Sequence, residues 1–138
     1  MVTTASGGRL HGMTASSFAS VSLDPTLILV VLDNTSQTRA LVLEAGTFAV
    51  NILSEHQEEI SRTFARRDDK SFDDLPHRFG DTGAPLLEGA IAWIECRGER
   101  VVDGGDHQIV IGEVVAASTA PGEPLVYYER AYRRMNDR

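Results

Sequence analysis

The sequence predicts an α+β domain that is mainly β, with about six or seven strands and two short helices. Three observations support this prediction: short segments with β-patterned side chains, two stretches with helical spacing, and glycine-rich turns between neighbouring strands. Most strands follow one another directly along the chain. Closure of such a sheet into a small barrel would remove its exposed edges.

The chain begins with a predicted hairpin. Val2 to Ala5 favours a strand, Ser6-Gly7-Gly8 forms a turn, and the chain is extended again from Arg9 to Ser16. Serine-rich extended structure continues to Leu23.

A strongly apolar strand follows the Asp24-Pro25 turn. The run from Thr26 to Leu32 has no polar face. We therefore expect it to be the central strand of the sheet, covered on both sides.

Two helices are predicted around a further strand. The first begins at Ser36 and ends at Gly46, which suits a C-terminal stop. Thr47 to Leu53 alternates as a strand. Ser54 to Gln57 has the form of a capping box with Ser54 as N-cap, so the second helix is expected to start at Glu55, with its basic end favoured by the helix dipole.

The C-terminal half is predicted to contain a long hairpin. Asp68 to Pro85 has little periodicity and is expected to be a surface loop that lies over a site. Leu87 to Val102 and His107 to Ala117 are β-patterned, and the glycine-rich turn between them suits a hairpin. Leu125 to Tyr128 forms a last short strand.

Length and composition limit the possible functions. A chain of 138 residues fits one domain, and its net charge of -7 argues against nucleic acid or an anionic membrane as the main partner. No segment approaches the roughly 20 apolar residues of a membrane helix, and the first residues do not resemble a signal peptide. The lone Cys96 excludes an intrachain disulfide and is expected to be a packed core thiol, so we expect a reduced, cytoplasmic setting.

Two clusters of hydroxyl residues flank the apolar strand. The cluster from Thr14 to Ser22 offers short side chains that let a flat or anionic ligand approach the backbone. The cluster from Asn34 to Thr38 opens a helix, whose N-terminus favours a phosphate. Either cluster alone is explained by turns and capping, but together they predict a binding site.

Several ordered segments resemble the short-chain flavin reductases that serve two-component flavin monooxygenases. They are GMTASSFASVSLDP, LILVVLDNTSQT, FAVNILSEHQ, GAPLLEGAIAWIECRGERVVDGGDHQIVIGEVV and PLVYYERAYR. The match extends over nearly the whole chain.

The resemblance implies an FMN-binding split β-barrel, a homodimer with the flavin near the subunit interface, and a flavin-dependent monooxygenase as partner. It also implies an NAD(P)H:flavin oxidoreductase that transfers hydride from NADH or NADPH to FMN or FAD. Residues 1–138 are expected to form one domain that lacks the usual N-terminal helix and part of the first strand.

The resemblance also implies the flavin-binding residues, and no metal is expected. Because the cofactors carry the chemistry of hydride transfer, we expect positioning residues and no catalytic side chain. The expected residues contact the flavin ring, the ribityl chain and the phosphate, and Arg39 adds charge if it points inward. They are Thr14, Ala15, Ser16, Ser17, Ser22, Leu23, Ser36, Thr38, Asn51, Leu53, Ser54 and Gln57.

Three further residues have specific expectations. Asn51 lies in an apolar strand, and a flavin carbonyl would supply the partner that its buried amide needs. His107 and Tyr132 are expected at the nicotinamide, whereas His11, His56 and His77 have no metal-ligand spacing and are interpreted as surface or capping residues.

Two other functions remain open at this stage. One is a barrel that binds FMN without turnover, as a carrier or electron-transfer protein. The other is a pyridoxamine-phosphate-oxidase-like enzyme, against which the sparse basic residues argue.

Overall fold

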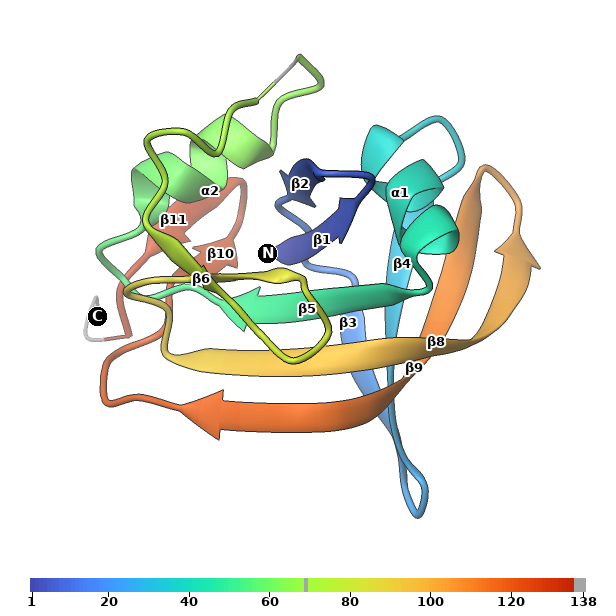
Figure 1. Ribbon diagram of the computed structural model, residues 1–138. Helices are drawn as coiled ribbons and strands as arrows, with labels where there is room; N and C mark the ends of the chain where they lie inside the picture. Colours follow the sequence, from blue (N-terminus) through green and yellow to red (C-terminus); the bar gives the residue numbers. More distant parts are fainter. Residues whose placement is uncertain (69, 136–138) are drawn as a thin grey trace.

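A seven-stranded antiparallel sheet forms the centre of the molecule. The computed structural model describes residues 1–68 and 70–135 (Figure 1). The strands lie in the order β2 (Arg9–Met13), β1 (Val2–Ser6), β5 (Thr47–Ile52), β8 (Ala92–Gly104), β9 (His107–Thr119), β4 (Thr26–Asp33) and β3 (Phe18–Leu23).

The connection between the two edge strands requires the sheet to curl. β2 and β3 stand at opposite edges, and only residues 14–17 join them. In a flat sheet these strands would be about 29 Å apart, whereas a connection of this length spans at most about 18 Å. The sheet is therefore bent into an open, barrel-like shape, which confirms the predicted mainly β architecture with two short helices.

The predicted N-terminal hairpin is confirmed. β1 and β2 pair from Val2 opposite Met13 to Ser6 opposite Arg9. The two residues between them, Gly7 and Gly8, have φ values of 56° and 77°, which favour glycine.

The strand expected at the centre lies near one edge. β4 is the sixth of the seven strands and has β9 and β3 as neighbours, whereas the central position belongs to β8. Ile28, Val30 and Leu32 are buried, but the residues between them are only half-buried. The prediction of a central strand covered on both faces was therefore wrong, because an apolar run does not by itself specify which strands pair with it.

The first helix agrees with its capping signals. α1 covers Gln37–Ala45, and the Ser36 hydroxyl accepts a hydrogen bond from Arg39 N. Gly46 ends the helix in the left-handed conformation, with φ of 68°.

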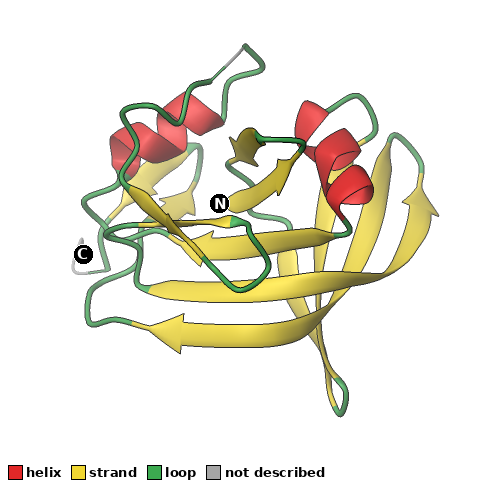
Figure 2. Ribbon diagram, viewed as in Figure 1, coloured by secondary structure: helices red, strands yellow, loops and turns green. Residues whose placement is uncertain are grey.

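The second helix starts later than predicted. α2 covers Glu58–Phe64, and its N-cap is Gln57 rather than Ser54. One of the two hydrogen bonds of a capping box is present: the backbone N of Ser54 donates to Gln57 Oε1 at 3.0 Å. However, Gln57 N donates to Ser54 O at 2.9 Å, so the residues between them form a turn before the helix begins. Figure 2 shows both helices on the same side of the long hairpin.

The segment predicted as a surface loop contains ordered structure. β6 (His77–Phe79) pairs with β7 (Pro85–Leu87), and Phe72 and Leu75 are buried. The prediction of a loop was therefore wrong for part of this segment, whose apolar residues are too few to show a period.

The two C-terminal hairpins differ in length. β8 and β9 pair along their whole length up to Gly104 opposite His107, which confirms the long hairpin predicted around the glycine-rich turn. The last predicted strand corresponds to β10 (Val126–Tyr128), which pairs with a second short strand, β11 (Ala131–Arg133).

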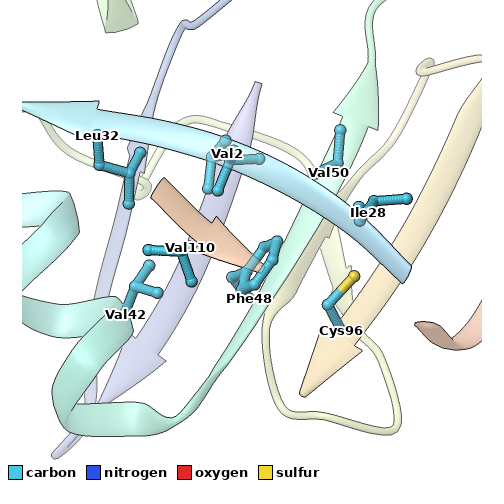
Figure 3. Packing of buried hydrophobic residues seen from close by; sticks show 9 residues of the cluster. Val2, Ile28, Leu32, Val42, Phe48, Val50, Cys96 and Val110 are labelled. Atoms are coloured by element: carbon cyan, nitrogen blue, oxygen red, sulfur yellow. The ribbon is translucent and has the colours of Figure 1, made fainter. Parts of the chain in front are cut away.

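A tightly packed apolar cluster lies inside the curled sheet. Phe48 and Cys96 are fully buried at its centre (Figure 3). Gly112 of β9 lies against them, and a β-carbon at this position would lie 2.7 Å from Phe48 Cζ and 2.8 Å from Cys96 Cβ. Because Gly112 of β9 has no side chain, the Phe48 ring of β5 and the Cys96 thiol of β8 can both pack at this position.

We expect Gly112→Ala to destabilise the fold by about 1–3 kcal/mol, because the added methyl group overlaps buried atoms that have little room to move. Denaturant unfolding measures this change. Gly104→Ala is the matched control in the same hairpin, since its β-carbon meets its nearest neighbour at an ordinary 3.5 Å. Equal stability of the two variants would contradict the packing described here.

We expect the Cys96 thiol to be unreactive in the native protein. Its side chain is fully buried, as the sequence predicted, and burial raises the pKa of the thiol to about 12. At pH 8 only about one molecule in ten thousand would carry the thiolate. An aromatic disulfide reagent should react with one thiol per chain only after denaturant is added. Stoichiometric reaction within minutes without denaturant would show that the site opens.

Candidate functional site

Two adjoining cavities lie between the sheet and α2. The first has a volume of about 670 Å³ and the second about 500 Å³. Thr14, Ala65 and Arg66 line both, so these residues form the boundary between them.

The first cavity is lined by the segment after β2, the end of β5, one side of α2 and the C-terminal hairpin. Thr14 fixes the position of the first of these segments. Its hydroxyl donates to Ser61 O at 2.8 Å, and its backbone N donates to Phe64 O at 2.9 Å. The backbone of Thr14, Ala15 and Ser16 is thereby held against the last turn of α2, at the cavity wall.

Asn51 lies at the end of β5 and lines the same cavity, but its amide already has partners within the protein. Nδ2 donates to Thr3 Oγ1 at 2.9 Å, and Oδ1 accepts from Leu87 N at 2.8 Å. In the described part of the chain, every buried side-chain nitrogen and oxygen has a hydrogen-bond partner. The expectation that a flavin carbonyl would be needed to satisfy Asn51 was therefore wrong, because β1 and β7 supply the partners.

The opposite wall of the first cavity is aromatic. Tyr132 hydrogen-bonds through its hydroxyl to Ser61 Oγ at 2.8 Å, and its ring centre lies 5.0 Å from that of Tyr127. The Arg62 guanidinium lies 4.6 Å from the ring centre of Tyr132. Leu53 and Leu125 complete a wall that combines apolar surface with polar groups at its edges, as flat heteroaromatic ligands require.

The second cavity is built around the start of α1. Ser36 and Thr38 line it, as do Thr35 and Gln37. Ser36 Oγ caps Arg39 N, and the first intrahelical backbone bond runs from Ala40 N to Ser36 O. The N–H groups of Gln37 and Thr38 have no acceptor within the helix, and such groups favour an anion.

Basic residues from the segment after α2 line the same cavity. They are Arg66, Arg67 and Lys70. Burial lowers the pKa of Lys70, and the nearby Asp68 opposes that shift. From the sequence, Arg66 and Arg67 are expected at the basic end of the second helix, but that helix ends at Phe64, so both arginines lie beyond it and line the cavity.

An acidic residue organises the loop before α1. Asp33 Oδ1 accepts hydrogen bonds from the Thr35 hydroxyl at 2.6 Å and from Thr35 N at 2.7 Å, and these bonds lower the pKa of Asp33. Asp33 Oδ2 lies 3.6 Å from Arg67 Nη2. The loop therefore presents its hydroxyls in a fixed position next to a basic side chain.

Several residues predicted at the site do not line these two cavities. Ser17 donates to Val31 O at 2.8 Å within the sheet. Ser22 and Leu23 lie at the tip of the β3–β4 hairpin, which projects from the sheet in Figure 1, and Leu23 is 93% exposed.

The capping segment and Arg39 also lie elsewhere. Gln57 Nε2 donates to Glu88 O at 2.8 Å, and Ser54 lines a separate cavity beside Gly122. Arg39 Nε donates to Gln108 Oε1 at 2.6 Å. Arg39 is therefore directed at β9 and adds no charge to the second cavity.

The two residues expected at the nicotinamide lie in different cavities of this chain. Tyr132 lines the first and His107 the second, where His107 Nδ1 lies 2.6 Å from Asp106 Oδ1. His11, interpreted from sequence as a surface or capping residue, also lines the second cavity. Sequence position could not show this, because the β1–β2 hairpin brings His11 beside a helix that begins 26 residues later.

The joined cavities can accept a flat, amphipathic ring with an anionic tail. The ring would lie between the Thr14 segment and the tyrosines, and the tail at the start of α1. Among residues 1–68 and 70–135, no group of three His, Cys, Asp or Glu side chains converges as a metal site. No helix in this part of the chain is long and apolar enough to cross a membrane.

Comparisons with known proteins identify the family of this chain. Residues 1–136 match the model of the flavin reductase like domain. The reductase component of a flavin-dependent trigonelline monooxygenase from Acinetobacter baylyi is 45% identical over 88% of this chain and 39% of its own length. A flavin reductase from Pseudomonas putida is 38% identical over 91% of this chain and 74% of its own length. The chain spans about two fifths of the first of these relatives and about three quarters of the second.

Solved structures share the fold. Nitrilotriacetate monooxygenase component B from Mycobacterium thermoresistibile superposes with a TM-score of 0.93 at 36% identity, over 98% of this chain and 77% of that one. BorF, the flavin reductase component of a bacterial two-component tryptophan halogenase, superposes with a TM-score of 0.90 at 39% identity. The match covers 99% of this chain and 89% of BorF. These matches confirm the predicted resemblance and fold class, and the chain belongs to the flavin reductase-like domain family.

Proposed function

We propose that this domain is an NAD(P)H:flavin oxidoreductase that passes hydride from NADH or NADPH to FMN or FAD and supplies reduced flavin to a separate monooxygenase. The observation that supports this most directly is the pair of joined cavities, one with aromatic and amide walls and one basic. Relatives with names of this kind include an FMN reductase (NADH) from Agrobacterium fabrum and an NADH-dependent FAD reductase from Streptomyces globisporus.

The first cavity is the proposed ring site. Backbone and hydroxyl groups of Thr14, Ala15 and Ser16 would face the polar edge of the ring, and Asn51 and Leu53 would lie beside it. Because the walls are held by Thr14 on α2 and by Asn51 on β1 and β7, the site is largely formed before a ligand enters. A preformed wall lowers the entropic cost of aligning two rings.

The second cavity is the proposed phosphate site. Ser36, Thr38 and the first N–H groups of α1 would donate hydrogen bonds, and Arg66 and Lys70 would supply charge. These donors and charges fit a flavin phosphate. The bound flavin and nicotinamide supply the redox chemistry itself, and the protein orients them.

A second copy of the chain would complete the site. Ser22 and Leu23 at the hairpin tip lie apart from both cavities of their own chain, so a flavin role for them requires a neighbouring subunit. Exposed apolar side chains on β3, β8 and β9 offer a surface for it; they are Phe18, Val21, Val101 and Val115. We therefore include the homodimer in the proposal. His107 and Tyr132 remain proposed contacts of the nicotinamide. Ser17, Ser54 and Gln57 line neither cavity, so the proposed flavin contacts of these residues require a ligand that extends beyond the two cavities.

The activity can be tested by following the oxidation of NADH and NADPH at 340 nm with FMN, FAD and no added flavin. We expect flavin to stimulate oxidation with at least one nicotinamide. No stimulation in any combination would refute the proposal. A yellow protein that retains flavin without turnover would instead indicate a binding or electron-transfer role.

The phosphate site can be tested with Arg66→Gln. Removal of this charge should raise the KM for FMN by at least about tenfold, since a charge-assisted hydrogen bond contributes about 1.5–3 kcal/mol. The KM for riboflavin, which has no phosphate, should change less than twofold. Arg9→Gln is the matched control, because Arg9 pairs with Glu44 at 3.5 Å on an exposed hairpin. An equal loss for both flavins would place Arg66 outside a phosphate site.

A further inference from the structure

One contact of the second cavity joins Thr38, a residue of the proposed phosphate site, to His11, which that role does not explain. His11 Nδ1 lies 2.8 Å from Thr38 Oγ1, and both residues line the cavity. His11 belongs to β2 and Thr38 to the first turn of α1, so this bond connects the N-terminal hairpin to the helix end. Thr38 is only 1% exposed, and its hydroxyl therefore has few possible partners.

The direction of this hydrogen bond determines what Thr38 can offer a ligand. A hydroxyl has one proton to donate and two lone pairs that accept. If Thr38 donates to a bare Nδ1, its only proton is used within the protein. If Nδ1 carries a proton and donates, the Thr38 hydroxyl accepts that bond and keeps its own proton for a cavity ligand.

The charges around the cavity favour the second arrangement. An anionic ligand attracts groups that donate and repels lone pairs. Both the imidazolium and the neutral ring protonated at Nδ1 supply the required donor. Among the residues that the structure describes, the charged and titratable groups that share this cavity with His11 are Asp33, Arg66, Arg67, Asp68, Lys70 and His107.

We propose that His11 is a positioning residue for the phosphate site: its Nδ1–H donates to Thr38 Oγ1 and so leaves the Thr38 hydroxyl proton to bind a flavin phosphate. This inference rests on the proposed function, because it assumes that a phosphate occupies the second cavity. His11 acts through Thr38 and has no role in hydride transfer.

The test compares the Kd values of FMN and riboflavin for the whole chain, by fluorescence titration. Their ratio isolates the phosphate, because the two ligands share the ring and the ribityl chain. His11→Leu should weaken FMN by at least about tenfold relative to riboflavin, as expected for one hydrogen bond to a charged group. His11→Asn places an amide N–H near the position of Nδ1 and should keep the ratio within about twofold.

A double-mutant cycle shows whether His11 acts through Thr38. Thr38→Val should also weaken FMN relative to riboflavin, and adding His11→Leu to it should have no further effect on this ratio. His56→Leu is the matched control, since the side chain of His56 is 76% exposed and lines a different cavity. Unchanged riboflavin binding shows that the variants are folded.

The outcomes separate this inference from the function on which it rests. If wild-type protein binds FMN no more tightly than riboflavin, the proposed phosphate site is wrong. If wild-type protein prefers FMN but His11→Leu leaves the ratio unchanged, weakens both ligands equally, or adds fully to Thr38→Val, the role of His11 is refuted. Failure of His11→Asn to retain the ratio would also refute it.

Discussion

The attachment of Thr14 to α2 is the interaction on which the candidate site depends. Its side chain and backbone both donate to the last turn of the helix, at Ser61 O and Phe64 O. These two bonds close the space between the edge of the sheet and α2, and Thr14 lines the cavities on both sides. Because residues 14–17 also join the two edge strands, the bonds that shape the site also hold the curl of the sheet.

The site shows how an acidic chain can present a local anion site. The net charge is -7, yet the segment after α2 brings Arg66, Arg67 and Lys70 to the start of α1. A helix N-terminus contributes partial positive charge without a charged side chain. Overall net charge argues against a broad basic surface, but it does not describe the electrostatic field inside a small cavity.

Two buried polar residues predicted at the site form hydrogen bonds within the protein itself. Asn51 connects β5 to β1 and β7, and Gln57 connects the turn before α2 to Glu88. In both cases the sequence showed that a polar side chain needs a partner. It did not show whether that partner belonged to the protein or to a ligand, because the partners are 31 to 48 residues away along the chain.

The sequence by itself determined the local elements and the family: the N-terminal hairpin, α1 with its Ser36 cap, the long β8–β9 hairpin and the two hydroxyl clusters. These features depend on backbone preferences and patterns within a few residues. Only the tertiary structure decided that β4 lies near an edge, that α2 starts at Glu58, and that His11 meets Thr38. Strand order and contacts between distant segments depend on how the sheet curls and packs, and no local pattern encodes that arrangement.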